Sequence, residues 1–220
     1  MGGRWGPQGA LLHSRRSFSP GGPMPRIRSD DYETKAQAIM DSAAAIFAKE
    51  GYPAAKMQDV AKACGATKSM LYHYFPTKDD LLFAMLQEHL QRLIGAIEEA
   101  LVSKASARER LQMVVEAYTQ KSAQSRRRHM VAMNDVKFLP KAKQTPLINL
   151  QRQLTEQVTR LLHDLNPELP EPVYKPYTMM LLGMLNWTDF WYKPSGEVKP
   201  QELCDRLSRL FLKGFLAEKG

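Results

Sequence analysis

The spacing of small and apolar residues between positions 57 and 82 constrains this chain more than any other feature. Val60 and Ala61 precede Gly65, and Leu71 and Tyr74 follow it. Two short helices that cross at a steep angle need a small side chain where they touch, a glycine in the left-handed turn and apolar residues that close the corner. The stretch therefore predicts a helix-turn-helix.

The second of these helices, at about residues 68–74, carries polar side chains on its exposed side. Thr67 is placed to cap its N-terminus, because a threonine hydroxyl accepts a hydrogen bond from an amide two or three residues on. We also expect Thr67 to contact DNA. Donors suited to phosphates and base edges follow: Lys68, Ser69, Tyr72 and His73. Two short helices joined by a glycine also occur in many other helical proteins, so spacing alone leaves a purely structural hairpin open.

A segment of the chain reads GATKSMLYHYFPTKDDLL, and it closely resembles the TetR family of bacterial repressors. The recognition helix of that family typically ends in Tyr-x-Tyr/His-Phe with a lysine one turn later, and here these positions hold Tyr72, Tyr74, Phe75 and Lys78. An upstream segment, ETKAQAIMDSAAAIFAKEGY, is similar to the family's first helix. The resemblance covers roughly residues 33–82. It implies a DNA-binding regulator in which Tyr74 and Lys78 join the DNA contacts.

The start of the preceding helix departs from that family. Where Thr-Ser or Thr-Thr usually begins the helix, this chain has Ala55 and Lys56. A hydroxyl N-cap that often also holds a phosphate is missing, so either Lys56 makes the contact through its charge or the contact is lost. Arg28, just before the first predicted helix, is a further candidate for contact with the DNA backbone.

The net charge of +8 does not by itself indicate a nucleic-acid partner, because nucleic-acid binding depends on where the basic side chains lie. Residues 24–80 carry eight basic and eight acidic side chains, so DNA contacts depend on where single cations lie. The excess of residues 81–220 is concentrated in residues 121–143, which hold seven basic side chains and one acidic one.

Helical periodicity continues through the rest of the chain without an alternating strand pattern. With 44% hydrophobic and 25% charged residues among 220, the composition is that of a folded globular protein. We therefore expect an all-α fold of about nine helices. The helices outside the helix-turn-helix are expected at about residues 31–50, 78–103, 107–125, 126–139, 145–165, 173–192 and 200–217.

Residues 1–25 are rich in glycine, proline, serine and arginine and are predicted to be a disordered tail. They are either a basic arm for the minor groove or the product of an upstream start codon with Met24 as the natural first residue, which we favour. Residues 26–76 are expected to form the helix-turn-helix DNA-binding domain, and residues 77–220 an effector-binding and dimerisation domain. The two cysteines lie far apart in apolar patterns, as expected of reduced thiols in a bacterial, cytoplasmic, nucleoid-associated protein.

The segment of residues 177–192 is apolar on nearly every side, so we expect other helices to bury it on all sides. It is short for a bilayer, and Asn186 and Asp189 interrupt it, so no membrane span is expected. In the TetR family the last two helices pair with their copies in a second subunit, and a leucine stripe that begins with Leu203 and Leu207 fits that pairing. The resemblance implies a homodimer through the last two helices; a monomer that buries both is the alternative.

Apolar residues adjoin the basic segment 121–143 and include Tyr118 and Phe138. An apolar pocket with a basic mouth suits a ligand with one apolar end and one multiply charged end, and methionines such as Met130 and Met133 adapt to varied shapes. Runs of like charge are usually solvated surface, so a plain solvated face competes with this interpretation.

A later segment, GMLNWTDFWYKPSGEVKP, resembles TetR-type regulators that sense acyl-CoA thioesters, including phenylacetyl-CoA and fatty-acyl-CoA. The resemblance implies that an acyl or aryl group enters among apolar side chains while arginines meet the CoA phosphates. The ligand-binding residues expected from the basic segment and this resemblance are Tyr118, Arg127, Arg128, Phe138, Met184, Trp187 and Trp191. Each aromatic residue is equally open to a role in core or dimer packing.

Catalytic motifs are missing from the sequence, which has no GxSxG, HExxH, CxxC or glycine-rich phosphate loop. His89 and His163 fit helical surfaces, so we expect no enzyme, metal or cofactor. We predict a repressor that binds a palindromic double-stranded DNA operator and is released by a small-molecule effector, preferably an acyl- or aryl-CoA thioester. The alternatives are a DNA-binding regulator with another hydrophobic effector or none, and an enzyme that acts on CoA esters.

Overall fold

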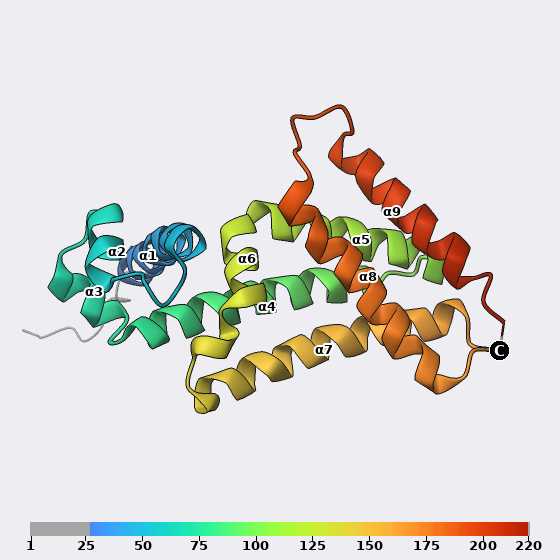
Figure 1. The fold of residues 1–220 in the computed structure, drawn as a ribbon, viewed down its shortest axis with the longest axis horizontal. Helices are drawn as coiled ribbons and strands as arrows, with labels where there is room; N and C mark the ends of the chain where they lie inside the picture. The colour runs from blue at the N-terminus through green and yellow to red at the C-terminus, as the bar shows by residue number, and fades with distance from the viewer. Residues whose placement is uncertain (1–26, 220) are drawn as a thin grey trace, which may run out of the picture.

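The computed structural model describes the backbone of residues 27–219 and the side chains of residues 31–219. Within this part of the chain the fold is all-α, as predicted, with nine α-helices and one 3-10 helix (Figure 1). The elements are α1 (Ile27–Glu50), α2 (Met57–Ala63), α3 (Lys68–Tyr74), α4 (Lys78–Leu101), α5 (Ala107–Gln124), α6 (Arg126–Asn134), η1 (Val136–Phe138), α7 (Lys141–Leu165), α8 (Glu171–Trp191) and α9 (Pro200–Phe215). The tail predicted at residues 1–25 lies outside the described residues.

The predicted helix-turn-helix is formed by α2 and α3. Gly65 has a φ of +67° in the turn between them, where a side chain would strain the backbone. Thr67 caps α3 as predicted, because its hydroxyl accepts from the amide of Met70 at 3.1 Å. Ala61 and Leu71 are buried where the two helices meet. The local sequence thus determines both the turn and the start of α3.

The end of α6 differs from the sequence prediction. A continuous helix was expected at residues 126–139, but α6 ends at Asn134 and η1 follows it. Pro140 explains only the end of η1, since a residue before proline is driven out of the α region. Leu139 accordingly has a ψ of 153°.

Two hydrophobic cores meet along α4, which runs from the helix-turn-helix into the larger helical half (Figure 1). The first core joins α1, α2, α3 and the start of α4 to α6 and the start of α7, and it includes Leu90. The second core, which begins with Leu93, joins the remainder of α4 to α5, α7, α8 and α9. A shift of α4 would therefore change the packing of both cores.

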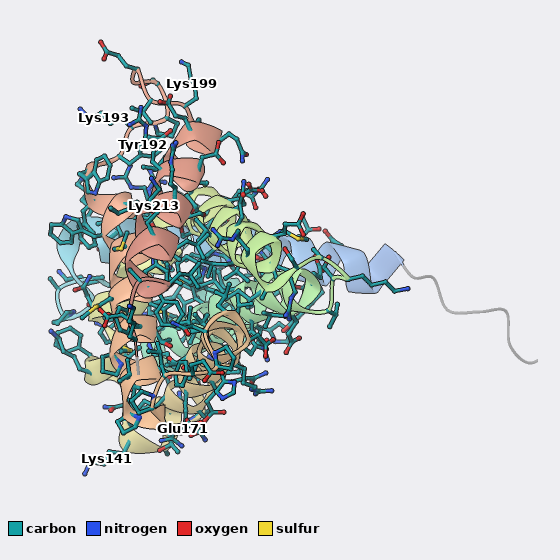
Figure 2. All side chains as sticks on the ribbon, turned by 90° about the vertical axis from the view of Figure 1, so that its right-hand side faces the viewer. Lys141, Glu171, Tyr192, Lys193, Lys199 and Lys213 are labelled. Carbon is teal, nitrogen blue, oxygen red and sulfur yellow. The ribbon has the colours of Figure 1, made fainter. Side chains whose placement is uncertain are left out.

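One face of the α8 and α9 pair has large apolar side chains that nothing in the described chain covers. The exposed fractions are 59% for Met180, 63% for Trp187 and 68% for Leu210. Figure 2 shows α8 spanning this side of the molecule, from Glu171 at one end to Tyr192 at the other, with Lys213 of α9 alongside. No helix among the described residues is long and apolar enough to cross a membrane.

Replacement of Gly65 by alanine should lower the free energy of unfolding by about 1 kcal/mol, because an L-residue in the left-handed region is strained by about 1–2 kcal/mol. An added Cβ meets nothing within 4 Å, so the effect is conformational. Gly95→Ala is the matched control: it lies within α4, also in open space, and should stabilise by about 0.5–1 kcal/mol. Urea denaturation measures both, and equal effects would contradict the turn assignment.

Candidate functional site

The exposed side of α3 presents four of the predicted DNA-contacting residues. Lys68, Ser69, Tyr72 and His73 are all exposed, while Leu71 between them is buried. The alternation follows from the helical period, which turns Leu71 into the core and the polar residues outward. The face thus offers an ammonium, two hydroxyls and an imidazole on one rigid, capped helix.

Three other predicted DNA contacts lie beside this face. Tyr74 is half-buried and its ring stacks on Tyr32 of α1, with centroids 4.4 Å apart, so it helps to hold α3 against α1. Lys56 is exposed at the N-cap of α2 and makes no side-chain cap bond. Arg28 is in the first turn of α1, where the structure describes only the backbone.

Lys78, another predicted DNA contact, has a structural role in this structure. Its ammonium group donates to the main-chain oxygens of Tyr52 at 2.9 Å, Pro53 at 3.3 Å and Ala55 at 3.0 Å. An ammonium has three donors, and these bonds use all of them. The amine also lies 4.5 Å from the centroid of the Tyr52 ring. Lys78 therefore fixes the loop between α1 and α2 to the start of α4.

A cavity of about 530 Å³ lies among α4, α5, α6, α7 and α8. Its wall is mainly apolar and, among the described residues, contains no lysine, arginine, aspartate or glutamate. Its polar groups come from Tyr118, His129, Asn134, Gln151, Thr155 and Asn186. Two of the predicted ligand residues, Tyr118 and Trp187, line it. The Trp187 ring stacks on Phe190, with centroids 5.0 Å apart, and forms one rim.

Three predicted ligand residues lie away from this cavity. Phe138 stacks on Tyr52 in the DNA-proximal half, with ring centroids 6.1 Å apart. Met184 packs against the second core, and Trp191 is 54% exposed at the end of α8. Because successive residues on a helix point about 100° apart, the positions next to Gly183 and Phe190 face elsewhere. None of these three residues lines the cavity.

The arginine assignment is also corrected. Arg128 is 3% exposed, and its guanidinium lies 2.8 Å from Asp41 of α1 and 3.4 Å from Glu88 of α4. It also donates to the Gln37 side-chain oxygen at 3.0 Å. Arg127 is exposed and lines a separate groove of about 360 Å³ beside α1. That groove and the cavity have no lining residue in common.

A buried network of polar side chains lies at one side of the cavity, and it was not predicted from the sequence. His129 Nδ1 lies 3.0 Å from His89 Nε2, and His129 Nε2 lies 3.1 Å from Asn186 Oδ1. The Asn186 oxygen only accepts, so His129 carries its proton on Nε2 and accepts from His89 on Nδ1. The Tyr118 hydroxyl donates to the same Asn186 oxygen. Both histidines are 2% exposed, so the surface position expected for His89 is wrong.

The environment of this network keeps its imidazoles uncharged. Burial lowers the pKa of His89 to about 3, and the charges of His129, Arg128 and Arg92 lower it further. Burial also lowers the pKa of His129, although Asp189 opposes that effect. Burial raises the pKa of Asp189 itself. The cavity therefore has a polar side made of neutral hydrogen-bonding groups.

The fold and these two sites define a DNA-binding transcriptional regulator with a C-terminal ligand-binding domain. The profile of bacterial regulatory proteins of the tetR family matches residues 39–85. The profile of the tetracyclin repressor-like C-terminal domain matches residues 104–215. The chain belongs to the TetR family, whose members are transcriptional regulators and not enzymes.

Individual relatives agree with this assignment. A TetR-family transcriptional regulator from Bordetella parapertussis is 35% identical, with a TM-score of 0.79 over 86% of this chain and 100% of that one. The transcriptional activator FasR of Mycolicibacterium smegmatis is 35% identical over 80 residues, which are only 36% of each chain. AibR, solved with isovaleryl coenzyme A and operator DNA, shares the fold at 21% identity, with a TM-score of 0.71 over 80% of this chain and 97% of its own.

Stability should fall as the pH is lowered from 7 to 5. The unfolded chain binds a proton on His89 near pH 6.5 while the folded protein does not until about pH 3. Neutral His89 then lowers the free energy of unfolding by about 1.4 kcal/mol per pH unit below 6.5. Urea denaturation across this window should show a shallower pH dependence for His89→Gln and an unchanged one for the exposed control His163→Gln. Equal slopes in all three proteins would contradict the buried neutral pair.

Proposed function

We propose that this regulator is a homodimeric repressor that leaves a palindromic operator when an acyl- or aryl-CoA thioester occupies the cavity. The observation that carries the proposal is the position of α6. Arg128 on this helix is bonded to α1 of the DNA-binding half, and the next residue, His129, lines the cavity. A ligand that displaces α6 would therefore act directly on the DNA-binding half.

In this proposal α3 of each subunit enters the major groove. Lys68, Ser69, Tyr72 and His73 are exposed on it, and hydroxyls and cations of this kind contact both phosphates and base edges. Lys56 and Arg28 are retained as proposed contacts with the flanking phosphates. A two-fold dimer would place its two recognition helices in successive major grooves, about 34 Å apart.

The uncovered face of α8 and α9 supports the dimer. Contiguous exposed apolar side chains of this size mark interaction surfaces, and here they include Met180, Trp187 and Leu210. Gly183 and Gly214 are exposed on the same two helices with open space around them, which allows a second pair of helices to approach closely. The proposed subunit contact is a bundle of these helices from two copies.

The cavity supports a small, mostly apolar effector group. Its volume of about 530 Å³ is within the range of small-molecule sites, about 300–1,000 Å³. The hydroxyl of Tyr118 and the amide of Asn186 would meet a polar atom of the ligand, such as a thioester oxygen. AibR, which was crystallised with isovaleryl coenzyme A, supports a CoA thioester as the effector class. A hydrophobic effector of another class, or none, is the alternative.

Lys68→Ala and Tyr72→Ala should each raise the operator Kd about tenfold or more, since one good DNA contact contributes about 1–3 kcal/mol. Fluorescence anisotropy with labelled operator measures this at fixed salt. Lys104→Ala is the matched control, because Lys104 is an exposed lysine beyond the far end of α4. Unchanged operator affinity in both α3 variants would refute the proposed DNA-binding face.

Ala132→Phe should fill part of the cavity and so weaken the response to effector. Ala132 is buried and lines the cavity, so an added phenyl ring competes with the acyl group for space. The concentration of CoA thioester that releases half of the operator should rise at least tenfold, measured at an operator concentration matched to each variant's own Kd. Ala217→Phe, at an exposed position beyond the end of α9 and outside the cavity, is the matched control. Identical release curves for both variants would place the effector elsewhere.

A further inference from the structure

The cavity borders a cluster of cations on α7 and α8. A second hollow of about 480 Å³ continues from it between these two helices. Thr155 lines both spaces, so the two are adjacent. The second hollow is lined by Arg152, Thr155, Glu156, Thr159, Arg160 and Lys175.

The helical geometry keeps these cations close to the cavity wall. Along α7, Arg152 is about 4.5 Å and Arg160 about 7.5 Å from Thr155 in axial rise. On α8, Lys175 lies one turn before Met179, which lines the cavity. The hydroxyls of Thr159 and Thr178 lie 2.9 Å apart and join the two helices beneath the hollow. The cations therefore stand on a fixed pair of helices, next to the apolar space.

The cations of this cluster have no ion-pair partner within the described part of the chain, although Arg160 also lines a hollow that contains Glu98 and Asp164. The hollow has three cations against the single carboxylate of Glu156. Arg152, Arg160 and Lys175 make no ion pair or hydrogen bond with any described residue, whereas Arg128 and Arg110 both pair with carboxylates. A group of cations that lie close together and form no ion pairs attracts a multivalent anion.

We propose that this cluster, defined as Arg152, Arg160 and Lys175, binds the phosphate-bearing end of the effector whose acyl end lies in the cavity. The inference rests on the proposed function, because it assumes that the cavity holds an acyl group. It replaces the basic run at residues 126–128 as the phosphate site. In that run Arg128 is buried in ion pairs, and the groove that holds Arg126 and Arg127 shares no described lining residue with the cavity.

The test compares two ligands with the same acyl group on the full-length chain. Phenylacetyl-CoA carries the phosphates, and the phenylacetyl thioester of N-acetylcysteamine lacks them. Isothermal titration calorimetry at low salt should show that Arg152→Gln, Arg160→Gln and Lys175→Gln together weaken the CoA ester at least tenfold and leave the truncated ester unchanged. Added salt should weaken the CoA ester more in the wild type than in this variant.

Two matched variants separate the possible failures. Arg126→Gln with Arg127→Gln should leave both ligands unaffected, and Ala132→Phe should weaken both. If the triple variant binds the CoA ester as the wild type does, or if the loss appears in the Arg126 and Arg127 variant instead, the cluster is not the phosphate site while the cavity assignment stands. If the wild type binds neither ester, the proposed effector class and this inference both fail.

Discussion

The buried guanidinium of Arg128 is the contact on which the joining of the two halves depends. It lies on α6, yet its partners are Asp41 of α1 and Glu88 of α4. A buried cation is tolerated only when it is paired, and loss of one partner leaves an uncompensated charge. The position of α6 is thus tied to that of α1, and α1 packs against the helix-turn-helix.

A second set of contacts makes the DNA-binding end a rigid unit. Lys78 fixes the loop between α1 and α2 to α4, and Tyr74 stacks on α1 through Tyr32. A face held in this way moves as a body when α4 or α6 shifts. Allosteric release needs only such a rigid element with two positions, one of which the ligand stabilises.

Sequence reasoning was most successful where short-range geometry determines the outcome. The glycine turn at Gly65 and the cap at Thr67 depend on residues within one helical turn, so their spacing predicted them. Whether a polar residue is buried depends on helices distant in sequence, and there the prediction failed for Arg128 and His89. Asn186 and Asp189, which interrupt an apolar helix, were the sequence signal for the polar network, because buried polar groups need partners.

The distribution of charge follows from the same packing. The DNA-binding half is neutral in sequence, but its carboxylates are drawn into the junction: Asp41 pairs with Arg128, and Asp80 lies 2.5 Å from Lys143. Both cations come from the basic segment 121–143, so part of that excess neutralises acids of α1 and of the start of α4. The exposed lysines of α2 and α3 then face solvent with fewer free carboxylates nearby. Part of the segment that the sequence suggests for ligand phosphates is therefore used to hold α6 and α7 against α1 and the start of α4.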